Sequence, residues 1–144
     1  MEANKAQVIN VLMVDDNPDD IELTIEAFRE SKKYFKVNVA QNGEEALNFL
    51  RKHGEFKNRP NPDLLLLDLN MPRMNGFEVL EEINRDRTLK EIPVIIFSIS
   101  QNPADMERAK TLNAKLYLVK PVGIEGIVNV VRTIETFVDN NITA

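Results

Sequence analysis

The stretch Asp63-Leu64-Leu65-Leu66-Leu67-Asp68-Leu69-Asn70-Met71-Pro72-Arg73-Met74-Asn75-Gly76 decides the fold. Four consecutive leucines between Pro62 and Pro72 predict a short strand that is buried on both faces. Asp68 follows this strand directly. Ligands of open α/β sheets bind beyond the carboxyl ends of the strands, so this carboxylate lies where chemistry is expected. A lone aspartate at such a place more often caps the next turn, so the interpretation depends on its neighbours.

Apolar strand patterns and amphipathic helix patterns alternate five times along the chain. The expected strands are 8–14, 36–40, 64–67, 93–98 and 116–119, and each precedes a predicted helix. This alternation predicts an α/β domain with a parallel sheet, right-handed crossovers and helices on both faces. With 144 residues, 43% of them hydrophobic, we expect a single domain over 1–144 with its core at about 8–138.

Finer features follow from local patterns. The strand 36–40 alternates and is expected at a sheet edge. The helix before it is expected to bury five apolar side chains, Ile21, Leu23, Ile25, Ala27 and Phe28. Asn42 and Glu45 resemble a reciprocal capping pair. The polar segment Gly54–Asn61 contains Phe56 and is either a slack surface loop or a partner surface.

Composition excludes several classes of function. The absence of cysteine excludes disulfides, thiol catalysis and cysteine-based zinc sites. The lone His53 lies in a polar run typical of a solvated helix end. A net charge of −5 argues against direct contact with nucleic acid. No apolar run is long enough to span a membrane and no signal peptide is recognisable, so we expect a cytoplasmic protein.

Parallel strands bring their carboxyl ends to one edge of a sheet. The polar residues expected to meet there are Asp15, Asp16, Asp68, Ser98 and Lys120. Clustered carboxylates repel one another by several kcal/mol at an effective dielectric of about 20, so the cluster needs a cation. Carboxylate, carbonyl and water oxygens suit Mg²⁺, for which Mn²⁺ can substitute, and no soft ligand selects a transition metal.

A metal ion and an ammonium beside one carboxylate predict phosphoryl transfer. Asp68 is the expected nucleophile and forms an aspartyl phosphate. Asp15 and Asp16 are the expected metal-binding acids, and Lys120 and Ser98 are expected to contact the phosphoryl oxygens. Each residue alone also has an ordinary structural explanation as a solvated charge, a strand-end hydroxyl or a helix-start acid.

The same residues resemble the receiver domain of two-component response regulators. The resemblance covers the whole chain in order and rests on Val14-Asp15-Asp16, Asp68-Leu69-Asn70-Met71-Pro72, Gly76, Ser98, Tyr117 and Lys120-Pro121. It implies a flavodoxin-like (βα)5 fold with strand order 2-1-3-4-5. It also implies that a sensor histidine kinase, or a small phosphodonor with Mg²⁺, phosphorylates Asp68.

Further roles are implied by this resemblance alone. Asp15, Asp16 and the backbone carbonyl of Asn70 would hold the metal ion. Ser98 and Tyr117 would form a switch pair that moves on phosphorylation and changes a surface of the fourth helix, fifth strand and fifth helix. The turn residues are Pro72, Gly76 and Pro121, and the Lys120-Pro121 bond would be cis.

Two residues depart from the family pattern. Ile99 replaces a small residue after Ser98 and is expected to narrow access to Asp68. Gly123 stands where a helix cap is usual, so the last helix should begin weakly capped. The length and the Gly54–Asn61 segment are similar to single-domain regulators paired with phytochrome kinases in cyanobacteria. That similarity suggests a phytochrome-type kinase as partner and a homodimer, with the downstream protein unknown.

Three alternatives remain open. An aspartate-nucleophile phosphatase would need a second acid two residues after Asp68, where Asn70 stands, and a cap for its substrate. A flavodoxin would need a phosphate loop after the first strand, where Asp15 and Asp16 would repel phosphate. A receiver-like binding module that acts without phosphorylation conflicts with the intact set of acids, Ser98 and Lys120, and requires an assay to exclude it.

Overall fold

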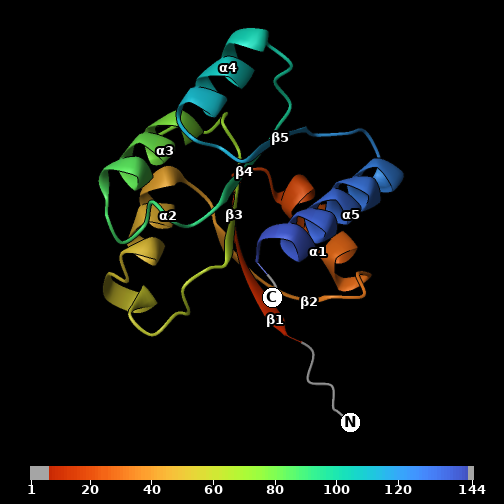
Figure 1. The fold of residues 1–144 in the computed structure, drawn as a ribbon, viewed down its shortest axis with the longest axis horizontal. Helices are drawn as coiled ribbons and strands as arrows, with labels where there is room; N and C mark the ends of the chain where they lie inside the picture. Colours follow the sequence, from red (N-terminus) through yellow and green to blue (C-terminus); the bar gives the residue numbers. More distant parts are fainter. Residues whose placement is uncertain (1–6, 143–144) are drawn as a thin grey trace.

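A computed structural model describes residues 7–142 as a five-stranded parallel sheet with helices on both faces (Figure 1). The strands are β1 (Val8–Val14), β2 (Tyr34–Ala40), β3 (Leu64–Leu67), β4 (Val94–Ser98) and β5 (Leu116–Val119). Their order is β2-β1-β3-β4-β5, which confirms the predicted fold class and places β2 at an edge. The β2 strand begins two residues earlier than its alternating pattern suggested.

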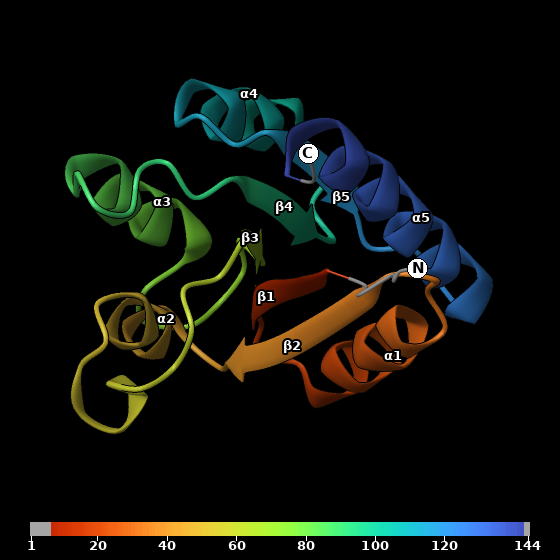
Figure 2. The same cartoon turned by 60° about the horizontal axis from the view of Figure 1, so that its bottom comes forward.

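Five α-helices and one short 3₁₀ helix connect and flank the strands. They are α1 (Pro18–Arg29), α2 (Gly43–Leu50), η1 (Gly54–Phe56), α3 (Gly76–Arg85), α4 (Pro103–Thr111) and α5 (Ile124–Asn141). Figure 2 shows α1 and α5 together on one side of the sheet, with α2, α3 and α4 on the other. Two layers of helices therefore enclose the sheet, as right-handed crossovers require.

The alternation of side chains along the strands divides the core into two clusters. Leu65 and Leu67 pack with α2 and α3, whereas Leu64 and Leu66 pack with α1 and α5. All four leucines are buried, which confirms that β3 is the central, two-sided strand. This strand fixes the position of Asp68, which follows it.

Asparagine caps begin four of the five α-helices, at Asn17, Asn42, Asn75 and Asn102. Of the two hydrogen bonds expected for a reciprocal capping pair at Asn42 and Glu45, only one forms. The Asn42 side chain accepts from Glu45 N, but the Glu45 carboxylate accepts from Gln41 N rather than from Asn42 N. The full reciprocal box occurs at α3 instead.

The expected weak start of α5 is confirmed, since Gly123 provides no side-chain cap. The prediction of a cis Lys120-Pro121 peptide bond is wrong, because residues 7–142 contain no cis peptide bond. The core face of α1 is also partly wrong. Leu23 is exposed, whereas Thr24 is fully buried. Thr24 can be buried because its hydroxyl donates to the Asp20 carbonyl and so needs no hydrogen bond to water.

The segment after α2 is held against the domain. Phe56 of η1 packs on Phe49 of α2 with ring centroids 5.5 Å apart. This contact anchors the segment, although most of its residues are exposed. Whether it binds a partner stays a prediction.

The helix α4 makes few apolar contacts with the sheet. Ala109 is its one buried residue. Polar contacts with α3 hold it instead: the Arg108 guanidinium lies 4.2 Å from the Phe77 ring centre, and Asn84 donates to the Leu112 carbonyl at 2.7 Å. Few apolar contacts mean that α4 can shift at low cost in free energy.

Candidate phosphoryl-acceptor site

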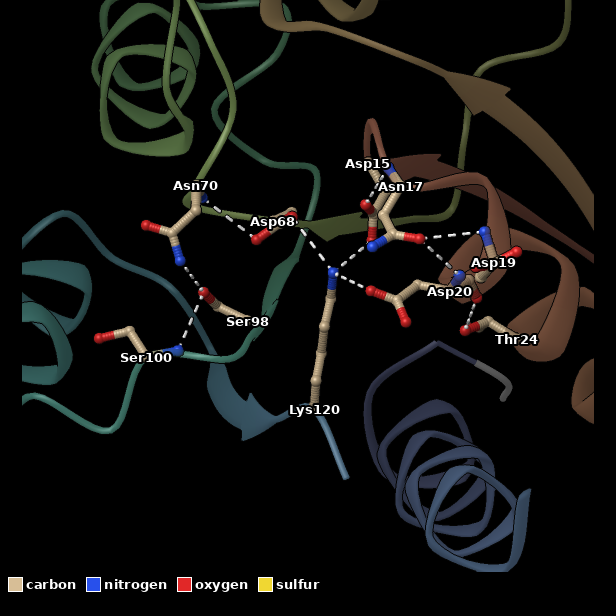
Figure 3. Close-up of polar contacts among 10 residues, drawn as sticks. All are labelled: Asp15, Asn17, Asp19, Asp20, Thr24, Asp68, Asn70, Ser98, Ser100 and Lys120. Atoms are coloured by element: carbon tan, nitrogen blue, oxygen red, sulfur yellow. Dashed lines mark hydrogen bonds and ion pairs between the residues drawn. The ribbon is translucent and has the colours of Figure 1, made fainter. Parts of the chain in front are cut away.

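The five polar residues predicted to converge do lie at the carboxyl edge of the sheet. Figure 3 shows four of them, Asp15, Asp68, Ser98 and Lys120. Asp15 follows β1, Asp68 follows β3, Ser98 ends β4 and Lys120 follows β5. Asp15, Asp68 and Ser98 are almost completely buried. Asp16 is exposed beside Asp15. The parallel sheet therefore brings together residues from four strands that are far apart in the sequence.

Asp68 is held by one hydrogen bond on each carboxylate oxygen. Its Oδ1 accepts from Asn70 N at 3.1 Å, and its Oδ2 accepts from Lys120 Nζ at 3.2 Å. The turn that follows approaches closely, because Gly76 lies against the Asp68 carbonyl. A Cβ at Gly76 would contact that carbonyl oxygen and would lie 2.8 Å from Leu69 Cα. Only glycine fits this approach, which accounts for the turn residue predicted from the sequence.

Three carboxylates of the site lie close enough together to share a cation. One oxygen each of Asp15, Asp16 and Asp68 lies within 4.8 Å of the others. Burial raises the pKa of Asp15, while Lys120 and the Asn17 N–H act in the opposite direction. Its Oδ2 lies 2.8 Å from Lys120 Nζ but accepts no hydrogen bond of normal geometry. Such a buried oxygen among carboxylates fits a hard divalent cation.

The Asn70 carbonyl was predicted as a further metal ligand from family resemblance. Asn70 begins the turn directly outside the acidic cluster, and its N–H already bonds Asp68. No described contact tests the carbonyl, so this role stays a prediction.

Lys120 contacts three carboxylates. Its Nζ lies 2.8 Å from Asp15 Oδ2, 2.9 Å from Asp20 Oδ2 and 3.2 Å from Asp68 Oδ2. Burial by itself would lower the pKa of Lys120, but hydrogen bonds and attraction from these carboxylates outweigh it and hold the pKa well above its ordinary value. Lys120 is therefore a permanent cation at the site.

Asp20 was not among the site residues predicted from the sequence. The available signal was its place in the first turn of a helix that starts at the functional edge of the sheet. Spacing could not show that Asp20 faces Lys120 and that its neighbour Asp19 does not.

Ser98 is joined to Asp68 through Asn70. The Ser98 Oγ accepts from Asn70 Nδ2 at 3.0 Å and from Ser100 N at 3.4 Å. Since both bonds use oxygen lone pairs, the hydroxyl proton of Ser98 is available to donate. Sequence reasoning assigned only the backbone of Asn70, so this side-chain contact is also new.

Tyr117 lies near the same loop. It is partly buried, packs on the core cluster, and its OH donates to the Ser100 carbonyl at 2.9 Å. Ser100 thereby contacts both members of the predicted switch pair. Their motion is not tested by a single structure and stays a prediction.

A (βα)5 parallel sheet with a lysine-paired aspartate in an acidic cluster at its carboxyl edge defines a receiver domain. The chain belongs to the response regulator receiver domain family, whose sequence model matches residues 11–132. It is therefore a response regulator of two-component signalling, and receiver domains act in signalling rather than as conventional enzymes.

Its relatives include regulators from phytochrome pathways. Response regulator Rcp1 from Synechocystis sp. is 36% identical over 136 residues, covering 94% of this chain and 91% of that protein. The solved structure of the phosphorylated cyanobacterial phytochrome response regulator RcpA is 38% identical with a TM-score of 0.88, covering 95% of this chain and 98% of that chain. The solved structure of the Mn²⁺-bound form of Rcp1 is 34% identical with a TM-score of 0.85, covering 94% of this chain and 97% of that chain. These similarities place the chain in the subgroup of receivers that contains Rcp1 and the cyanobacterial phytochrome response regulator RcpA.

No helix within residues 7–142 is long and apolar enough to cross a membrane.

Proposed function

We propose that Asp68 accepts a phosphoryl group from a phosphohistidine of a sensor histidine kinase in the presence of Mg²⁺. The observation that carries this proposal is the contact of Lys120 with Asp68 inside the acidic cluster. An ammonium beside a buried carboxylate offers positive charge where a phosphoryl group would develop negative charge. Asp15 and Asp16, with the Asn70 carbonyl, would hold the Mg²⁺, and Mn²⁺ would substitute.

In the transfer step, a carboxylate oxygen of Asp68 forms a bond to phosphorus while the phosphorus–nitrogen bond of the phosphohistidine breaks. The electron pair of that bond stays on the imidazole, which then takes up a proton. Bound Mg²⁺ would supply further positive charge to the phosphoryl oxygens. Lys120 contacts the same oxygens, and Ser98 donates its free hydroxyl proton to one of them. The protein thus contributes positioning and electrostatics to its own phosphorylation and dephosphorylation.

Phosphorylation would change the surface through the loop after β4. If Ser98 turns toward the phosphoryl group, its bonds with Asn70 and Ser100 must change. The Ser100 carbonyl also holds Tyr117, so movement of the loop reaches β5 and the first turn of α4. The few apolar contacts of α4 make it the element that responds.

The relative RcpA, a phytochrome response regulator, supports the proposed kinase partner. The kinase is proposed to be of phytochrome type, and the downstream protein is unknown. Residues 1–144 are proposed to form one receiver domain. The protein is proposed to be a cytoplasmic homodimer. The alternative of a binding module that works without phosphorylation is disfavoured by the intact Asp68–Lys120 pair.

Incubation with acetyl phosphate and Mg²⁺, followed by intact mass measurement, tests the proposal. We expect one added phosphoryl group on the parent and on Asp19→Asn, a surface control, and none on Asp68→Asn. A parent protein that stays unlabelled by acetyl phosphate and by histidine kinases would refute the proposal. Size-exclusion chromatography with and without beryllofluoride then measures whether the dimer depends on phosphorylation.

A further inference from the structure

The third carboxylate at Lys120, Asp20, has no role in the phosphoryl transfer described above. It comes from the first turn of α1, whereas Asp15 and Asp68 follow strands (Figure 3). Its Oδ2 lies 2.9 Å from Lys120 Nζ, closer than the Asp68 oxygen at 3.2 Å. In this structure, Asp20 and Asp68 therefore share the ammonium.

The backbone of Asp20 is fixed on both sides. Its N–H donates to Asn17 Oδ1 at 3.2 Å, and its carbonyl accepts from the buried Thr24 hydroxyl at 2.7 Å. The Asn17 N–H in turn donates to Asp15 Oδ1 at 2.9 Å. These bonds and the two contacts of Lys120 form a closed ring through Asp15, Asn17, Asp20 and Lys120. The carboxylate of Asp20 is thus presented to Lys120 by a constrained helix start.

Lys120 does not depend on Asp20 for its position. Its own N–H donates to the Ser98 carbonyl at 2.8 Å, its Nζ lies 5.7 Å from the Phe97 ring centre, and Asp15 contacts it independently. An ammonium has three N–H donors. Two of them donate to Asp20 and Asp68, and the third carboxylate, Asp15, forms an ion pair with Nζ at 2.8 Å. A phosphoryl group on Asp68 must therefore share Lys120 with acceptors that are already in place.

We propose that Asp20 is a competing counter-ion for Lys120 that weakens the hold of the site on a phosphoryl group. This inference rests on the proposed phosphorylation of Asp68. Asp20 acts through the charge of Lys120 and does not itself contact the reacting atoms.

Affinity for beryllofluoride, measured by ¹⁹F NMR titration at saturating Mg²⁺, tests this role. Saturating Mg²⁺ removes any effect of the substitution on metal binding. The variants are Asp20→Asn and Asp20→Ser, and the matched control is Asp19→Asn, which removes the same charge one residue away without a described contact to Lys120. We expect about fivefold tighter binding by both Asp20 variants than by the control, since a partly exposed ion pair contributes up to about that factor.

Acetyl phosphate should also half-saturate the Asp20 variants at a correspondingly lower concentration, and added salt should narrow the difference from the control. A purely structural role of Asp20 would not tighten binding or create this salt dependence. Equal or weaker beryllofluoride binding by the folded Asp20 variants, relative to Asp19→Asn, overturns the inference. A parent that binds no beryllofluoride and accepts no phosphoryl group instead refutes the proposed function, on which the inference rests.

Discussion

Replacing Lys120 by methionine should destabilise the protein as well as impair phosphorylation. Methionine keeps an apolar side chain of similar length near Phe97, so the substitution mainly removes the ammonium. The Lys120 side chain is 7% exposed, and its partners Asp15 and Asp68 are 1% and 6% exposed. These carboxylates would lose their protein counter-ion where water cannot replace it.

The magnitude follows from the burial of the pair. Breaking a buried ion pair by removing one partner costs about 3–5 kcal/mol. The lower end applies here, because Asp20, the third carboxylate beside Lys120, is partly exposed and remains hydrated. We therefore expect Lys120→Met to lose about 3 kcal/mol of unfolding free energy at neutral pH without Mg²⁺.

Urea unfolding followed by far-ultraviolet circular dichroism measures this loss, since the chain contains no tryptophan. Mg²⁺ should restore part of the stability, because it supplies another cation to the same carboxylates. The matched control is Lys33→Met, which removes a partly exposed pair with Asp139 and should cost less than about 1 kcal/mol. A loss of under about 1 kcal/mol in Lys120→Met, or no response to Mg²⁺, would refute the reasoning.

Phosphorylation of Lys120→Met by acetyl phosphate should slow by about a hundredfold, the usual effect of removing one preorganised electrostatic contact. Because burial raises the pKa of Asp15 above its ordinary value of 3.8, the contribution of Asp15 to stability is present at low pH and is lost as pH rises through the raised pKa. Asp15→Asn should therefore gain stability relative to the parent as pH rises from about 4 to 7 without Mg²⁺; a constant difference in unfolding free energy would contradict this. Gly76→Ala should cost about 2 kcal/mol by forcing a Cβ against the Asp68 backbone, and an unchanged urea midpoint would show that the turn can move freely. Ile99 is 66% exposed beside Ser98, and we expect its side chain to narrow access to Asp68. Ile99→Ala should therefore speed the gain or loss of the phosphoryl group severalfold, which is measured by the rate of labelling with acetyl phosphate and the rate of its loss. Identical rates in the two proteins would argue that Ile99 leaves the site open.

The strand ends were predictable from the sequence because they depend on local patterns. An apolar run such as Leu64–Leu67 predicts a buried strand, and the polar residue that follows it must reach the edge of the sheet. Asp15, Asp68, Ser98 and Lys120 were all found in this way, and they lie where the pattern placed them.

The errors occurred where burial or bonding depends on neighbours outside the local pattern. Thr24 is buried and Leu23 exposed because a hydroxyl can bond within the helix while it faces the sheet. Glu45 bonds Gln41 rather than completing a box with Asn42. Neighbouring residues of similar polarity look equally suitable in the sequence. The path of the folded chain decides which of them is buried or forms the hydrogen bond.

The sequence by itself determined the class of fold, the edge that carries the chemistry and the residues that follow its strands, because strand burial and its interruption are local properties. Only the tertiary structure decided how these residues share their hydrogen bonds. Asp20 and Lys120 are 100 residues apart, and Asn70 and Ser98 are 28 apart. Each pair meets because right-handed crossovers stack separate strand ends and helix starts at one edge, and the direction of a side chain there depends on the whole packed domain.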